Sequence, residues 1–172
     1  ALREALAEPR YSLLLQRFAD WLERRAWREV CHDKQSERLA DPVRAFAIPL
    51  LERDHRRVVK QGDLFAELSA EQRHRLRIRI KQLRYAQDFF NSLYETATVR
   101  RYLDALSKLQ DCLGVMNDIS VARRLLDEAG LRSVSAARQV IEGWYGCRLD
   151  IHERQFAEVW QQFLDCERPW KV

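Results

Sequence analysis

The chain has 172 residues, of which 33% are charged, and its formal net charge is only +4. Five glycines and four prolines are too few for a turn-rich β architecture, and the abundant leucine, alanine, arginine and glutamate favour helices. The composition therefore predicts an all-α fold, an antiparallel helical bundle of about five or six helices that forms a single helical domain over residues 1–172.

The cysteines and the hydropathy argue against a secreted or membrane-spanning protein. Cys31, Cys112, Cys147 and Cys166 are scattered without CxxC spacing, which is typical of reduced thiols in a cytoplasmic protein. No apolar run approaches the length of about 18 residues that a spanning helix needs, so we expect no membrane partner. Because the chain begins at Ala1 rather than at methionine, we interpret it as a piece of a longer protein.

The first two helices are predicted from apolar periodicity and from capping residues. The first spans about residues 9–28, and its apolar side comprises Tyr11, Leu14, Leu15, Phe18, Leu22 and Ala26. The polar stretch at residues 32–37 is read as a connection. A second helix should begin after Asp41, with Pro42 at its first position, and stop at about Gly62. Pro49 lies within it and is expected to kink it.

The third helix opens with a Ser-x-x-Gln capping box at residues 69–72 and is predicted to run to about Glu95. Thr98 can cap a fourth helix, whose continuation Gly114 weakens. Asn117 and the following aspartate are read as the cap of a new short helix that ends near Gly130.

A last long helix is expected from about residue 133 to residue 166. It contains Gly143 and Gly146, where we expect a neighbouring helix to pack closely.

Basic side chains recur along the third helix in the segment "HRLRIRIKQLRY", residues 74–85. On a helical wheel four of them share a stripe roughly 80° wide. These are His74, Arg77, Lys81 and Arg84, which we call the basic stripe. One apolar lane, on one side of it, contains Leu76, Ile80, Leu83, Phe90 and Tyr94, and a second lane contains Ile78, Tyr85 and Phe89. A solvated charged face normally lies opposite a single apolar stripe, so the pattern predicts cations at the wall of a cavity between packed helices.

The second helix carries a companion set of cations, Arg53, Arg56, Arg57 and Lys60. If the two helices are antiparallel neighbours, both sets converge on one cleft, where like-charge repulsion favours a ligand with many negative charges. Arginine and lysine both suit phosphate oxygens. The alternative is that these are solvated faces paired with nearby carboxylates. We assign that role to Arg75 and Arg79, and we expect Asp88 to neutralise one stripe cation.

Three segments in this order resemble the CHAD family, the conserved histidine α-helical domain. They are "RDHRRVVKQG" at residues 53–62, the stripe with its His-x-x-Arg-x-x-x-Lys-x-x-Arg-Tyr spacing, and "LQDCLGVMND" at residues 109–118. The resemblance implies a module of two similar helical halves around a basic channel that binds inorganic polyphosphate. The chain resembles the C-terminal half, and its N-terminal half is apparently absent.

The resemblance also implies partners and roles. The basic stripe would contact phosphate and the companion set would assist. The missing half or a second copy, and a CYTH-type domain in the same protein, would be partners. Localisation to polyphosphate granules in the cytoplasm would follow, with non-catalytic binding and no cofactor.

Two other functions are weighed against polyphosphate binding. A basic helix also suits a nucleic-acid backbone, although a recessed stripe could not enter a groove. A phosphate-substrate hydrolase using His74 as a base is less favoured, since no nucleophile or third carboxylate is evident beside it. Neither the pair Asp111 and Asp118 nor the pair Cys31 and His32 has the further ligands of a metal site, so we expect no metal.

Overall fold

A computed structural model describes residues 2–26, 28, 41–129 and 136–171, and every regular element among them is helical. The predicted all-α class is therefore confirmed. The structure divides into two compact units, Ala1–Val43 and Arg44–Val172, where the sequence had suggested a single domain, and we describe each unit by itself. No helix in the described ranges is long and apolar enough to cross a membrane.

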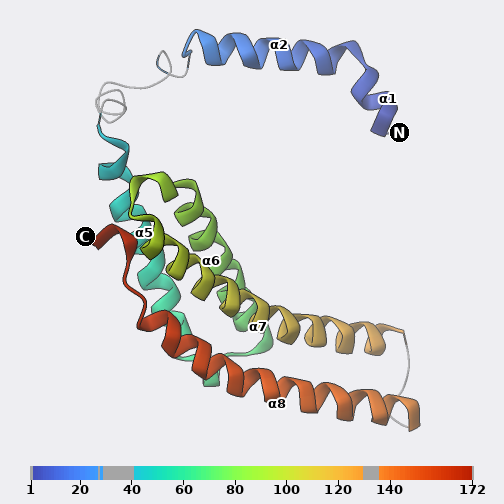
Figure 1. Ribbon diagram of the computed structural model, residues 1–172. Coiled ribbons are helices and arrows are strands. Elements are labelled where there is room, and N and C mark those ends of the chain that lie inside the picture. The colour runs from blue at the N-terminus through green and yellow to red at the C-terminus, as the bar shows by residue number, and fades with distance from the viewer. Residues whose placement is uncertain (1, 27, 29–40, 130–135, 172) are drawn as a thin grey trace. The chain divides into compact units, whose positions relative to one another are not determined.

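The first unit contains two helices, α1 (Leu2–Ala7) and α2 (Pro9–Glu23) (Figure 1). Helix α2 stops earlier than predicted, and Arg25 just beyond it has a left-handed φ of 53°, which a continuing helix cannot adopt. The predicted apolar side of α2 exists, but none of its residues is buried. The stretch 32–37, Trp27, Cys31 and His32 lie outside the described residues.

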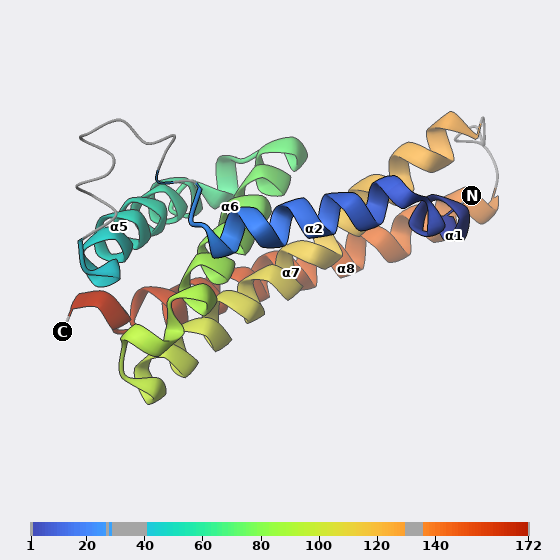
Figure 2. The ribbon, with the colours of Figure 1, turned by 90° about the horizontal axis from the view of Figure 1, so that it is seen from above.

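The second unit is built from four helices, α5 (Val43–Gly62), α6 (Ala70–Phe89), α7 (Thr96–Glu128) and α8 (Ala136–Leu164). Short 3-10 turns at Phe65–Glu67, Asn91–Leu93 and Pro169–Lys171 flank them. Helix α5 continues through Pro49. Figures 1 and 2 show α7 and α8 running side by side beyond the ends of α5 and α6 as a two-helix arm.

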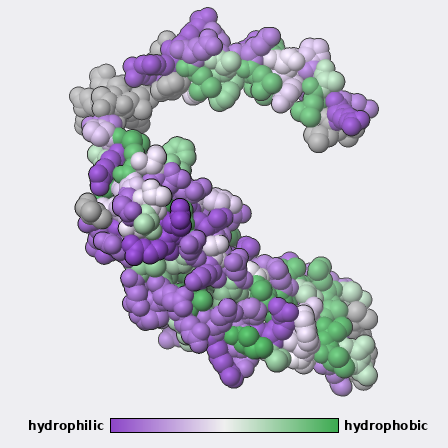
Figure 3. Space-filling view, in the orientation of Figure 1, coloured by the Kyte–Doolittle hydropathy of each residue, from purple (hydrophilic) through white to green (hydrophobic). Residues whose placement is uncertain are grey.

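Hydrophobic residues gather at the free end of this arm in the face that Figure 3 shows. The exposed apolar side chains in this part of α7 and α8 are Val121, Leu125, Val140, Ile141 and Trp144. The core lies at the other end, where α5 and α6 cover the arm. Its largest fully buried members include Leu51, Leu76, Ile80, Leu83, Tyr102, Leu106, Leu109, Leu113, Phe156 and Phe163.

The capping box at the start of α6 is confirmed, because the Ser69 hydroxyl accepts from the Gln72 amide and the Gln72 side chain accepts from the Ser69 amide. Helix α6 ends at Phe89, before the predicted limit. The cap of α7 is Glu95 and not Thr98, since the Glu95 carboxylate accepts from the backbone amides of Ala97 and Thr98.

The break predicted within residues 96–128 is wrong, because α7 is one continuous helix through Gly114 and Asn117. The Asn117 side chain bonds to another helix instead of capping its own. The prediction that a neighbouring helix packs closely on Gly143 and Gly146 is also wrong for the described chain. A Cβ atom added at either glycine meets no described atom of a neighbouring helix within 4 Å.

Gly62 packs directly against a tryptophan ring at the end of α5. A Cβ atom there would lie 2.1 Å from the Trp160 ring, which stacks on Phe156 and donates a hydrogen bond to Asp63. The ring therefore has little freedom to move aside, and we expect Gly62→Ala to lower the free energy of unfolding by about 2 kcal/mol. Chemical denaturation followed by circular dichroism measures this loss.

Gly143→Ala is the matched control for that substitution. Nothing surrounds this position within 4 Å, and alanine is the better helix former, so we expect a gain of about 1 kcal/mol. If Gly62→Ala stabilised the protein as Gly143→Ala does, the predicted clash at Gly62 would be contradicted.

Candidate anion-binding site

Helix α6 packs on its unit through one side, which contains Leu76, Ile80 and Leu83. This side is the first of the two predicted apolar lanes and belongs to the core. The second lane is not packed, because Ile78, Tyr85 and Phe89 are 39%, 53% and 79% exposed. The basic stripe of His74, Arg77, Lys81 and Arg84, called the α6 stripe from here on, therefore lies between the core and an open apolar face. In the described chain, other helices cover only the first of the two lanes beside it. Sequence periodicity predicts that a helix face is apolar, but it does not predict whether other residues of the same chain pack against that face.

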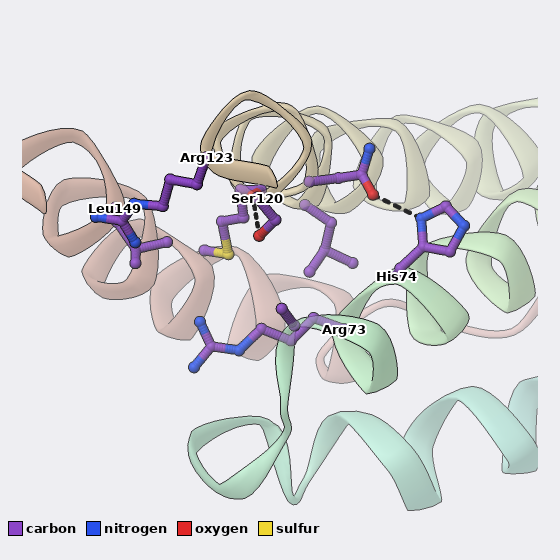
Figure 4. Close-up of a pocket in the computed structure, with 9 residues that line it drawn as sticks. Arg73, His74, Ser120, Arg123 and Leu149 are labelled. Atoms are coloured by element: carbon purple, nitrogen blue, oxygen red, sulfur yellow. Dashed lines mark hydrogen bonds between the residues drawn. The ribbon is translucent and has the colours of Figure 1, made fainter. Parts of the chain in front are cut away.

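His74 is exposed near the start of α6 and contacts α7. Its Nδ1 atom lies 2.6 Å from Oδ1 of Asn117 (Figure 4). A carboxamide oxygen can only accept a hydrogen bond, so the Nδ1 atom carries the hydrogen and donates it. The Nε2 atom is on the other side of the ring from this bond (Figure 4).

Arg77 lies one turn further along α6 and is partly buried against α7. A Cβ atom at Gly114 would be 3.7 Å from its Nε atom and 3.9 Å from its Nη2 atom. The Nε atom is buried and forms no hydrogen bond with any described residue, which costs free energy.

Arg84 and Lys81 continue the stripe beside an exposed aromatic ring. The Arg84 Cζ atom lies 4.9 Å and the Lys81 Nζ atom 5.5 Å from the centre of the Tyr85 ring, which are cation–π distances. The Nε atom of Arg84 is also buried, and it has no hydrogen-bond partner among the described residues. Within the described ranges, no carboxylate forms an ion pair with Arg77, Lys81 or Arg84, so the positive charge of the stripe is not neutralised.

The companion cations of α5 are exposed and mostly paired. Arg53 and Arg57 lie 2.9 and 3.5 Å from Asp54. Arg56 lies 2.9 Å from Glu52. Lys60 is exposed, and no ion pair is formed by it in the described part of the chain. The three arginines of α5 are thus closer than the α6 stripe to the alternative of solvent-exposed cations paired with nearby carboxylates.

The two sets of cations face different neighbours. A cavity of about 210 Å³ between α5 and α6 is lined by Asp54, Arg57, Arg79 and Gln82. Arg57 therefore adjoins Arg79, which we had assigned to solvent, whereas the stripe residues His74 and Arg77 adjoin α7. Arg75 forms an exposed ion pair, in which its Nη2 atom lies 3.3 Å from Oε1 of Glu71. This contact agrees with the expectation that Arg75 is a solvent-exposed, paired charge.

A second cavity of about 120 Å³ adjoins His74 where α6, α7 and α8 meet (Figure 4). Its arginines are engaged, because Arg73 pairs with Glu153 and Arg123 lies 2.9 Å from Glu142. This cavity was not predicted from the sequence, because its residues come from helices distant in the chain. Its charges are balanced, so it does not extend the unpaired stripe.

Other candidate chemistry has less support. Asp111 and Asp118 are exposed, and no group of three potential metal ligands occurs among the described residues. Cys112, Cys147 and Cys166 are free thiols. Burial raises the pKa of the Cys112 thiol to about 11, which disfavours its reactive thiolate form.

Comparison with known proteins identifies one family. Residues 1–127 match the CHAD domain, so the match covers well over half of the chain and includes the whole α6 stripe. No curated protein and no solved structure matched the sequence.

Proposed function

The chain belongs to the CHAD domain family, and we propose that it binds inorganic polyphosphate without chemical turnover. The binding surface is the α6 stripe, His74, Arg77, Lys81 and Arg84, with Arg53, Arg56, Arg57 and Lys60 as a weaker, second contact. The observation that carries the proposal is the charge of the stripe, in which Arg77, Lys81 and Arg84 form no ion pair with any described carboxylate. Guanidinium and ammonium groups donate charge-assisted hydrogen bonds to phosphate oxygens.

The extent of the stripe favours a chain of phosphates over a single one. From His74 to Arg84 the helix rises by roughly 15 Å, which no single phosphate can span. An extended polyanion can contact successive members of the stripe. Binding of this kind would target the protein to polyphosphate, including polyphosphate granules in the cytoplasm.

The open apolar lane beside the stripe, formed by Ile78, Tyr85 and Phe89, supports a second wall supplied from elsewhere. We propose that a second helical half of the CHAD type, or a second copy of this chain, covers it. Light scattering with and without long-chain polyphosphate tests this requirement. A strict monomer that binds the ligand tightly would contradict it.

Nucleic acid is the second candidate, and the same open lane favours it. The stripe is less recessed than its sequence pattern predicted, so a phosphate backbone could reach it. A competition between long-chain polyphosphate and duplex DNA at physiological salt separates the two. We expect polyphosphate to displace DNA, and the reverse order would refute the proposed function. Release of inorganic phosphate during the incubation would instead indicate a hydrolase.

The affinity for polyphosphate should depend strongly on salt. A polyanion held by several lysine and arginine side chains releases condensed cations as it binds. We expect the dissociation constant to rise by about two orders of magnitude between low and moderately high salt, measured by fluorescence anisotropy. A dissociation constant that hardly changed would point to a small, enclosed ligand.

A further inference from the structure

We infer that Gly114 and Asn117 of α7 are positioning residues, which fix two cations of the α6 stripe before the ligand arrives. This inference rests on the proposed function and adds a second helix to the binding machinery. It assigns a physical role to the middle of the segment 109–118, whose glycine and asparagine neither end nor cap a helix.

The first element is the hydrogen bond between His74 and Asn117, 2.6 Å long. Because the Asn117 oxygen accepts from Nδ1–H, the neutral ring is held as the Nδ1–H tautomer. A second proton can then be taken up only at Nε2, which makes Nε2–H the donor for a phosphate oxygen. The bond also restricts rotation of the imidazole, so less side-chain entropy remains to be lost on binding.

The second element is the contact between Arg77 and Gly114. The Arg77 guanidinium reaches over α7 where the glycine has no side chain, at a distance that leaves space for a methyl group and for little more. Glycine costs about 1 kcal/mol relative to alanine inside a helix. Within the described chain, neither a left-handed φ nor a closer contact accounts for glycine at this position.

Both contacts belong to one antiparallel register between α6 and α7. His74 lies opposite Asn117 and Arg77 lies opposite Gly114. At these two positions a short side chain, or none, on α7 faces a planar cation on α6. Cations held in this way are preorganised, which improves affinity by lowering the cost of ordering them.

The Asn117 contact is tested with Asn117→Leu, which keeps the approximate size but removes the acceptor. In the ligand-free protein we expect the ¹⁵N signals of the His74 ring to shift from the Nδ1–H tautomer towards a tautomer mixture. Asn117→Asp retains an acceptor and should keep the Nδ1–H tautomer. Ser120→Ala is the control, because that hydroxyl lines the same cavity but donates to the Met116 carbonyl.

Affinity for long-chain polyphosphate provides the second measurement. Asn117→Leu should weaken binding by about tenfold, and it should have no further effect in a His74→Ala background. An equal loss in both backgrounds would mean that Asn117 acts on the helix bundle and not through His74, which would refute the inference.

The Gly114 contact is tested with leucine at two helix glycines. Gly114→Leu fills the space of the Arg77 guanidinium and should reduce affinity as far as Arg77→Ala does, with no further effect in an Arg77→Ala background. Gly143→Leu is the control, because a Cβ atom there meets no described atom within 4 Å. If Gly114→Leu bound as the unaltered chain does, Gly114 would have no positioning role.

Failure of the inference and failure of the proposed function can be told apart. The tautomer of the His74 ring is measured without ligand, so it tests positioning even if polyphosphate does not bind. The opposite outcome is also distinct. If the unaltered chain binds polyphosphate, and Asn117→Leu changes neither the tautomer nor the affinity, the positioning role is refuted and the proposed function is not.

Discussion

Replacing Arg77 and Arg84 together with glutamine is expected to weaken polyphosphate binding by about a hundredfold or more. Each arginine lacks an ion-pair partner in the described chain and can give charge-assisted hydrogen bonds to phosphate. Such bonds contribute about 1.5–3 kcal/mol each, so two of them account for the expected factor. Isothermal titration calorimetry against one polyphosphate preparation at one salt concentration measures the loss.

Two matched variants hold the charge change constant and alter its place. Arg75 and Arg154 are exposed and pair with carboxylates one turn away, so their replacement by glutamine should cost only a few-fold in affinity, through the long-range field. Replacing Arg53 and Arg57 reports on the α5 contact, and we expect an intermediate loss. Equal losses for all three pairs would show that total charge, and not the α6 stripe, governs binding. Unaltered circular dichroism in each variant excludes unfolding as the cause.

The parts of the site that could be predicted from the sequence are those that depend on one helix. The capping box at Ser69 and the shared face of His74 and Arg77 follow from local spacing, and both are present. Helical geometry alone fixes such faces, whatever the helix later packs against.

The error in α7 has a physical explanation. Gly114 and Asn117 are poor helix formers, and taken alone they indicate a helix end and a new cap. Here tertiary contacts override local propensity, because both residues face α6 and accommodate Arg77 and His74. A local rule broken in the middle of a helix therefore marked the site, although the sequence could not show which residues it served.

The neighbours of each cation also lay beyond the sequence. Arg53 and Arg57 share Asp54, whereas Arg77 lies against a glycine, and wheel positions do not distinguish these environments. The exposed lane of α6 is a similar case. Its apolar character was evident, but whether this chain covers it depends on the packing of the whole unit.

Stability should fall steeply between pH 6.5 and pH 4 because of a buried histidine away from the stripe. His55 is 9% exposed, its Nδ1 atom lies 2.8 Å from the Tyr102 hydroxyl oxygen, and its ring adjoins Phe163 and Trp170. Burial, with a further contribution from the positive charge of Arg168, lowers the pKa of His55 to about 4. In the unfolded chain a histidine has a pKa near 6.5.

The direction of the effect follows from proton binding. Between pH 6.5 and pH 4 the unfolded state takes up a proton at this residue and the folded state does not, so acid favours unfolding. This loss of stability is absent above the pKa of His55 in the unfolded state and is complete below its pKa in the folded state. It amounts to about 3 kcal/mol in the free energy of unfolding. Urea denaturation at a series of pH values measures it.

His55→Gln should remove this dependence. A separate loss, due to a carboxylate, is expected at lower pH both in this variant and in the unaltered chain. Burial of Glu52 tends to raise its pKa, but hydrogen bonds from Trp170 and Arg56 and the charge of Arg168 outweigh burial and lower the pKa to about 2. The stability due to ionised Glu52 is therefore present above the unfolded glutamate pKa near 4.3 and is lost as pH falls towards 2. His55 and Glu52 therefore affect stability in successive pH ranges. If the free energy of unfolding of His55→Gln still fell by about 3 kcal/mol between pH 6.5 and pH 4, a group other than His55 would be the cause.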